Sequence, residues 1–246
     1  MNATIFKILL VVAIFAAVLG STYPKQRSAI EEEKANNYDN AVALEAMRTK
    51  KRFEDVEKNT NSSVEERLAA GNAYASALSS QQRFDEAARI YQDQLALTWG
   101  LVNNAHNPKW ADASMRLAGA HRNLDSQGPA LVCYESVLKH DQQFLPANDP
   151  RICRDLNNMG LMHYLIAMGK SEPAERKKEF QTSRNYLEQA LALIDKNNQG
   201  SSVKASATLW NLFLTCRDLD DTAAAERYKL RAQTIDKSLN RVCREP

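Results

Sequence analysis

A pattern of paired small and large residues recurs along the chain and constrains its fold more than any other feature. In four segments, a small residue is followed four positions later by a larger apolar or aromatic one. The pairs are Ala87 and Tyr91, Ala130 and Tyr134, Ser183 and Leu187, and Ala224 and Tyr228. Residues four apart lie on one face of an α-helix, so each pair indicates a helix that packs closely against another. The sequence therefore predicts a repeated helical unit.

The spacing of these pairs agrees with a regular repeat. The small residues are separated by 43, 53 and 41 positions, and the long interval contains an extra segment of 11 residues, 170–180. An earlier helix in each unit has matching positions at intervals of 43, 42 and 52, which are Ala75, Ala118, Gly160 and Leu212. One helix pair of this length cannot bury its apolar faces alone. Successive copies are therefore expected to stack into a solenoid.

The repeat predicts an all-α fold with four helix pairs and no sheet. The expected helices are 64–79 and 84–98, 109–124 and 128–140, 151–168 and 178–195, and 203–217 and 221–238. The low content of glycine (8) and proline (7) favours long helices over many short strands and turns. We assign residues 63–246 to the repeat domain and residues 23–62 to a charged helical spacer or an incomplete leading repeat, with a helix at 36–58.

The segment from Asp149 to Tyr164, DPRICRDLNNMGLMHY, opens a helix with proline and then carries a leucine and two asparagines. With the small-to-aromatic pairs, it resembles the tetratricopeptide repeat (TPR) family, in the longer variety of about 42 residues found in kinesin light chains. The resemblance covers roughly residues 64–236 and implies a TPR-like superhelical solenoid. A period near 42 residues also suits HEAT or armadillo repeats. The two-helix unit and the Ala/Tyr pairs favour the TPR interpretation.

The first 22 residues differ in kind from the rest of the chain. After Lys7, residues 8–20 contain no polar side chain, which is typical of a secretory signal cleaved before Ser21. Alternatively, residues 3–23 reach the length of about 20 residues that an uncleaved membrane anchor needs. A buried core helix is a third interpretation. The first two predict that the chain is exported to the cell envelope, periplasmic or extracellular, or is anchored in the membrane.

Composition and motifs argue against several classes of function. Lys and Arg total 32 and Asp and Glu total 30, so there is no basic excess and nucleic acid is not a predicted partner. The chain has no catalytic motif such as G-x-S-x-G or H-E-x-x-H, so no enzyme is predicted. No cofactor is predicted either.

Cysteine and histidine give no signal for a metal site. The four cysteines are far apart and are expected to be free thiols: Cys133, Cys153, Cys216 and Cys243. His121 and His163 hold equivalent repeat positions on the core side, so helix packing explains them. His106 and His140 are expected near helix ends or in loops. No metal-binding residue is therefore predicted.

The first helix of each pair is expected to line the concave side of the solenoid. Its face away from the core gives the candidate peptide-binding residues, which are Asn72, Met115, Arg122, Asn123, Arg154, Asn157, Asn158, Leu161 and Tyr164. An asparagine amide both donates and accepts, so it can pair with an extended peptide backbone. The family resemblance implies the same role. The alternatives for Asn157 and Asn158 are a solvated face or a hydrogen bond between helices.

These observations together predict a non-enzymatic protein–protein interaction scaffold. The partner would be an unknown protein or peptide segment bound in the concave groove. A second hypothesis is a structural, self-associating component of the cell envelope whose groove is filled by its own termini. A third is an enzyme whose site carries no recognisable motif.

Overall fold

The computed structural model describes residues 34, 36–99 and 106–242, and every regular element among them is a helix. An N-terminal helix occupies residues 36–58, as the sequence predicts. The others are α2 (Val64–Ser80), α3 (Phe84–Trp99), α4 (Pro108–Asn123), α5 (Gln127–Phe144), α6 (Pro150–Gly169), α7 (Pro173–Lys196), α8 (Val203–Asp218) and α9 (Thr222–Val242). The predicted all-α fold with four helix pairs is confirmed over these residues.

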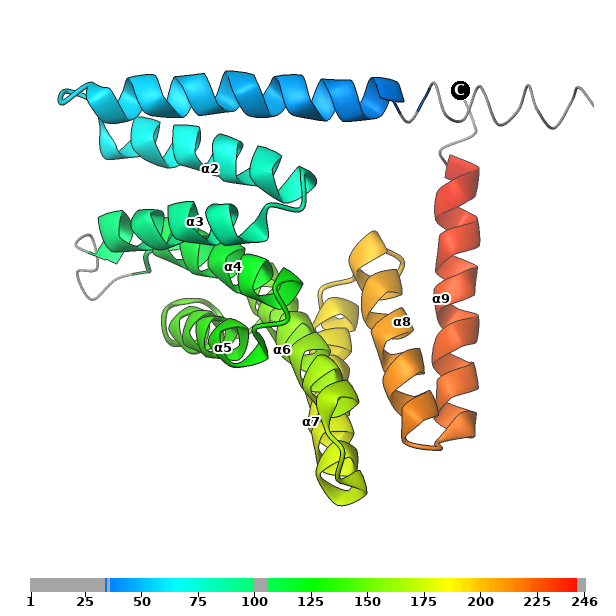
Figure 1. Cartoon of the computed structure of the whole chain (residues 1–246). Helices are drawn as coiled ribbons and strands as arrows, with labels where there is room; N and C mark the ends of the chain where they lie inside the picture. Colours follow the sequence, from blue (N-terminus) through cyan, green and yellow to red (C-terminus); the bar gives the residue numbers. More distant parts are fainter. Residues whose placement is uncertain (1–33, 35, 100–105, 243–246) are drawn as a thin grey trace, which may run out of the picture.

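The helices form successive hairpins that follow one another along a curved stack (Figure 1). Each helix packs against the next one in the chain, and α6 also contacts α8. The pairs are thus α2 with α3, α4 with α5, α6 with α7, and α8 with α9. Because the contacts run between neighbours, the stack has the quasi-linear organisation of a repeat protein.

Burial confirms the repeat register. The small residues of the second helices are all fully buried, namely Ala87, Ala130, Ser183 and Ala224. Their larger partners four residues later include Tyr134 and Leu187, which lie in the cores of successive pairs. Gly160 in α6 shows why a small residue is needed: a Cβ atom at this position would lie 2.5 Å from Cγ of Leu187. The two helices of this pair therefore approach closely.

Each first helix of a pair begins with a side-chain cap. The capping residues accept a hydrogen bond from a backbone N–H of the first turn and are Ser63, Asn107, Asp149 and Ser202. Such a cap typically stabilises a helix by about 1 kcal/mol. The sequence thus sets the start of every repeat locally, before any contact between repeats is made.

The structure corrects the helix boundaries most at the extra segment of the third pair, and α5 and α9 also end later than predicted, at Phe144 and Val242. The sequence predicts a helix at 178–195, whereas α7 begins at Pro173 and runs for 24 residues. Proline is well accommodated in the first helical turn, where its missing N–H leaves no hydrogen bond unmade. The residues that follow, AERKKE, are all good helix formers. The insertion therefore lengthens the helix instead of preceding it.

The N-terminal helix packs against α2, with the Phe53 and Tyr74 ring centroids 5.6 Å apart. Among the helices that the structure describes, none combines the length and the apolar character that crossing a membrane requires. The predicted signal or anchor, residues 1–22 or 3–23, lies outside the described residues. Export and membrane attachment therefore stay predictions.

Candidate functional site

A pocket lies where the first helices of the third and fourth pairs meet. Its volume is about 250 Å³, and we call it the α6–α8 pocket. Its lining residues are Pro150, Arg151, Cys153, Arg154 and Asn157 of α6, Ile194 of α7, and Lys204, Ala207 and Thr208 of α8. Of the candidate peptide-binding residues, Arg154 and Asn157 come together here.

Part of the pocket wall is apolar. Ile194 and Cys153 are both almost completely buried, and Ala207 lies at the exposed side. Burial raises the pKa of the Cys153 thiol above its usual value. A thiol of this kind is protonated at neutral pH and is a poor nucleophile, so Cys153 contributes surface and not reactivity.

The positively charged side chains of the pocket differ in whether they are already paired with an acid. Arg151 donates to both carboxylate oxygens of Asp149 at 2.9 Å, and this contact lowers the pKa of Asp149 to about 2. Arg154 donates to Oδ1 of Asp155 at 2.9 Å. Lys204 forms no ion pair within the described part of the chain. The charge of Lys204 is therefore the one most available to a ligand.

Asn157 connects two repeats. Its Oδ1 atom accepts hydrogen bonds from Oγ1 of Thr208 at 3.1 Å and from Nδ2 of Asn211 at 3.2 Å. Both donors belong to α8, so the side chain links the third pair to the fourth. Its Nδ2 group makes no hydrogen bond with the described residues and can still donate to a ligand. Asn157 thus makes the hydrogen bond between helices that was one of its predicted alternatives, while its peptide-binding role stays a prediction.

Replacing Asn157 with alanine should lower the free energy of unfolding by about 0.5–1.5 kcal/mol, because two hydrogen bonds to α8 are lost. Asn158→Ala is the matched control, since Asn158 makes no side-chain hydrogen bond among the described residues and should change stability by less than about 0.5 kcal/mol. Urea denaturation of the two variants and the parent chain measures the difference. Equal effects would show that the contact with α8 contributes nothing to stability.

Four of the remaining candidate residues lie in the first two pairs. Asn72 is half-buried in α2, and its Oδ1 atom is buried with no hydrogen-bond partner within residues 36–99 and 106–242. Met115 packs against the core between α4 and α5. Arg122 is half-buried in the last turn of α4, and Asn123 is exposed at its end. None of these residues lines the α6–α8 pocket.

The other three lie in α6. Asn158, Leu161 and Tyr164 are half-buried. The Tyr164 hydroxyl donates to Oδ2 of Asp218 at 2.8 Å, and burial, together with this carboxylate, raises its pKa to about 12. Tyr164 therefore connects α6 to the end of α8, and its hydroxyl is already engaged. Of the nine candidates, Arg154 and Asn157 line the α6–α8 pocket and the other seven do not.

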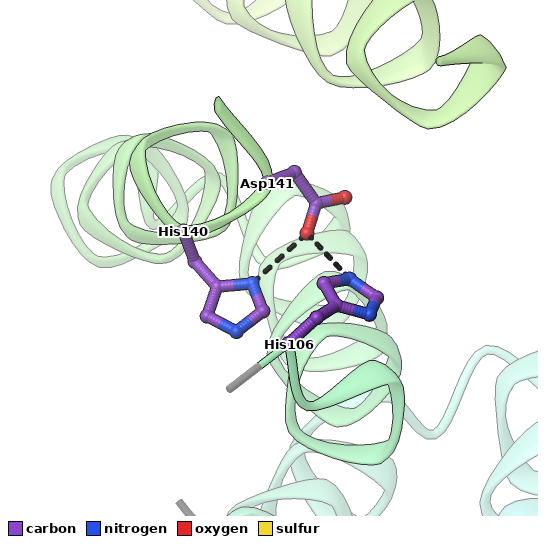
Figure 2. A group of neighbouring side chains, drawn as sticks. All are labelled: His106, His140 and Asp141. Atoms are coloured by element: carbon purple, nitrogen blue, oxygen red, sulfur yellow. Dashed lines mark hydrogen bonds and ion pairs between the residues drawn. The ribbon is translucent and has the colours of Figure 1, made fainter. Parts of the chain in front are cut away.

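A second polar site, which the sequence did not predict, lies at the end of α5. Figure 2 shows His106 and His140 converging on one oxygen of Asp141. Nδ1 of His140 lies 2.9 Å from Oδ1 of Asp141, and Nε2 of His106 lies 3.2 Å from the same atom. Asp141 is fully buried. Two histidine ring nitrogens thus contact the same oxygen of one buried carboxyl group.

A second buried acid, Asp155 of α6, lies near Asp141. Asp155 is also almost fully buried, and Nη2 of Arg154 lies within 4 Å of a carboxyl oxygen of both Asp155 and Asp141. Burial raises the pKa of Asp155 to about 7, although the Arg154 guanidinium opposes this shift and the Asp141 carboxyl group adds to it. Arg154 therefore belongs both to this acid pair and to the α6–α8 pocket.

The His106, His140 and Asp141 side chains invite comparison with a metal site, since their ligand atoms lie within 4.8 Å of one another. The backbone N–H of Asn107, however, donates to Nε2 of His140 at 3.2 Å, so this nitrogen carries no hydrogen. The neutral ring then carries its hydrogen on Nδ1, which faces Asp141. A metal ion would need the lone pair of that same nitrogen. The cluster fits a hydrogen-bonded carboxyl group, and we assign it no metal.

The helical spacing in the sequence predicts that Asp141 and Asp155 are buried. Asp155 lies three residues after Ile152 and four before Met159, so it falls on the core stripe of α6. Asp141 likewise follows the buried Leu138 by three positions. An acid on a core stripe predicts a buried carboxyl group with specific partners. The histidine partners come from elsewhere in the fold, and spacing does not predict them.

This chain is similar to known proteins in its structure. No family model matches the chain, and no curated protein matches it significantly. Among solved structures, BtubC (BKLC) from P. vanneervenii is similar with a TM-score of 0.66 and 15% sequence identity, over 80% of this chain and 74% of that chain.

Two structures with nearly identical TPR-like repeats, from a protein of Podosopora anserina assigned provisionally as a kinesin light chain, are similar with TM-scores of 0.67 and 0.65. Each is 16% identical and covers 87% of this chain and 96% of that one. At this identity, the likeness establishes the type of fold and leaves the partner open.

Proposed function

We propose that this chain, which has the TPR-like repeat fold, is a non-enzymatic scaffold that binds a segment of a partner protein. Repeat stacks of this kind present extended surfaces that suit protein interaction. The observation that carries the proposal is the α6–α8 pocket, which is built from the first helices of two successive pairs. It combines an apolar wall with the Nδ2 group of Asn157 and the ammonium group of Lys204, neither of which is paired with a residue that the structure describes.

The size of the pocket favours a segment of a protein over a small molecule. Pockets that enclose drug-sized ligands usually measure about 300–1,000 Å³. At about 250 Å³, the α6–α8 pocket is suited to anchoring one side chain of a longer ligand. The remainder of that ligand would lie along the neighbouring helices.

The polar groups indicate which segment would bind. The free Nδ2 group of Asn157 would donate to a backbone carbonyl of an extended peptide. Lys204 would pair with an acidic side chain or a terminal carboxylate, and such charge-assisted hydrogen bonds are stronger than neutral ones. We therefore expect a partner segment with a small apolar side chain next to an acidic group.

We also propose that this scaffold works in the cell envelope, exported or anchored by residues 1–22. The apolar run at residues 8–20 after Lys7 supports this location. A partner segment would then be exposed in the same compartment. Self-association of the chain is the competing function, and the following experiment separates the two.

A photo-crosslinking amino acid at position 207, at the exposed side of the pocket, should capture the partner in intact cells of the native host. Lys204→Glu should reduce the yield of this adduct about tenfold, because charge reversal at an interface costs on the order of 1.4 kcal/mol. Mass spectrometry of the adduct in membrane, soluble and secreted fractions identifies the partner and its location.

The controls are the same crosslinker at Val132, which is exposed on α5 away from the pocket, and Lys177→Glu on α7. Adducts of equal yield at both positions, or adducts insensitive to Lys204→Glu, would contradict the proposed site. An adduct with a second copy of this chain would support the self-associating alternative. Adducts confined to the cytosol, with Met1 retained, would refute the proposed location.

A further inference from the structure

Two buried carboxyl groups, those of Asp141 and Asp155, lie near the same guanidinium nitrogen where α5 packs against α6. Nη2 of Arg154 is 2.8 Å from Oδ1 of Asp155 and 3.7 Å from Oδ2 of Asp141. Each has one oxygen that is well supplied with donors. Oδ1 of Asp141 is contacted by the two histidines, and Oδ1 of Asp155 accepts from Arg154. The second oxygen of each group, Oδ2, is buried and has no hydrogen-bond partner in the described part of the chain.

Two ionised carboxylates would be unfavourable in this arrangement. Both Oδ2 atoms would be removed from water without a donor, which typically costs several kcal/mol for a charged group. The two like charges would also repel each other in a medium of low dielectric constant. Arg154 does not resolve this, because its Nη2 atom is 3.7 Å from Oδ2 of Asp141, beyond hydrogen-bonding distance.

We propose that Asp141 and Asp155 share one proton in the folded protein, and that this proton is a pH-sensitive lock between the second and third helix pairs. A proton between the two Oδ2 atoms turns two unsatisfied acceptors into a donor and an acceptor. It also leaves the pair with a single negative charge, which the single positive charge of Arg154 balances. One proton thus accounts for both unpartnered oxygens.

The other charged groups around the pair come from several elements. They are His106 before α4, Asp112 of α4, His140 of α5, and Arg151 and Arg154 of α6. No residue of α7 or α8 forms an ion pair with Asp141 or Asp155 among the residues that the structure describes. Oδ1 of Asp112 lies 3.9 Å from Nη1 of Arg154. Asp112 therefore pairs with the same arginine as the two buried acids, but its own side chain is exposed.

The sign of the pH dependence follows from the direction of the shift. Because the pKa of Asp155 is raised to about 7, the folded protein holds a proton that the unfolded chain releases near the ordinary aspartate value of about 4. The folded state therefore binds more protons between these values, and the free energy of unfolding falls as the pH rises through this range. Above it, the pair carries two charges and the contact of α5 with α6 is weakened.

The same proton affects the binding surface, because Arg154 also lines the α6–α8 pocket. This consequence rests on the proposed function. Once the proton is lost, Arg154 faces two carboxylates on its inner side and is drawn away from the pocket. An acidic group of a partner should then bind more weakly at higher pH.

The test compares thermal unfolding of the full chain and its Asp155→Asn variant between pH 5 and pH 8.5. Asparagine reproduces the protonated acid, because its amide donates to Oδ2 of Asp141 while its oxygen accepts from Arg154. We expect the melting temperature of the parent to fall, relative to the variant, by about 4 °C or more between pH 6 and pH 8. Asp112→Asn is the matched control and should follow the parent.

Parallel profiles for the parent and Asp155→Asn would overturn the proposal. A carbon-detected NMR titration of the aspartate carboxyl groups of the parent gives an answer even if the variant does not fold. Absence of a carboxyl resonance that titrates between pH 5 and pH 8.5 would then refute the shared proton. Stabilisation by zinc sulfate that is lost in His106→Ala would also overturn it, in favour of a metal site.

Both measurements use the chain without a partner. A negative result therefore leaves the proposed function intact, and failure of the crosslinking experiment leaves the shared proton intact. The binding consequence has its own readout, which is the yield of the position-207 adduct at pH 6 and pH 8. A yield that is higher at pH 6 in the parent and independent of pH in Asp155→Asn is expected, and an equal pH response in both would refute this link.

Discussion

Replacing Leu212 with alanine should lower the free energy of unfolding by about 2–5 kcal/mol, because the substitution deletes a fully buried side chain and leaves a cavity. Leu212 has no exposed surface and lies in the core shared by α7, α8 and α9. The equivalent positions of the second and third pairs are Ala118 and Gly160. A comparison of repeat sequences alone would therefore favour the alanine, whereas the packing of this pair opposes it.

Leu230→Ala is the matched control, since Leu230 lies on α9 and is 66% exposed. It should change stability by less than about 0.5 kcal/mol. Urea denaturation followed by circular dichroism measures both variants. A Leu212→Ala chain as stable as the parent would mean that the fourth pair packs differently from the structure described above.

Replacing a glycine with alanine should change the stability of the chain in opposite directions at two positions in the first helices. At Gly160 the added methyl group would lie 2.5 Å from Cγ of Leu187 and 3.1 Å from the backbone oxygen of Ser183. Since a backbone atom cannot move aside as a side-chain end can, α6 and α7 would have to separate, at a cost of about 1–3 kcal/mol. At Gly119 in α4, by contrast, an added methyl group would meet no atom of the described residues within 4 Å.

Gly119→Ala should therefore stabilise the chain, by roughly 0.5–1 kcal/mol, because alanine is the better helix former. The pair of variants differs in position only, so helix propensity is controlled within the experiment. In thermal unfolding, the midpoint of Gly119→Ala should be higher than that of the parent, and the midpoint of Gly160→Ala should be lower. Shifts of the same sign would refute the close approach of α6 to α7.

The repeat architecture could be predicted because its signals are local. Helix starts are marked by capping residues such as Ser63 and Asp149, and the small residues recur at a nearly constant interval. The predicted start of α7 is wrong because the repeat interval places the insertion outside the helix. Its own composition, proline followed by strong helix formers, predicts a longer helix when it is considered alone.

The candidate site was predictable only in part. The spacing of Arg154 and Asn157 places both on one face of a helix, and the structure brings them to one pocket. Their partners Thr208 and Asp141 are distant in sequence, so no periodicity within α6 indicates them. Lys204 is not among the predicted residues because an exposed lysine near a helix start is ordinary in sequence, and only the fold places it beside Cys153.

The α6–α7 hairpin, whose helices have 20 and 24 residues, is the longest of the four hairpins, and its length bears on the order in which the chain acquires structure. A helical hairpin is made of contacts close in sequence, so its formation costs little chain entropy. In a stack held by neighbour contacts, structure can nucleate at any unit and spread from it. Of the four hairpins, the α6–α7 hairpin has the most extensive contact between its own two helices. We therefore expect folding to begin in the interior of the chain and to proceed outward toward both termini.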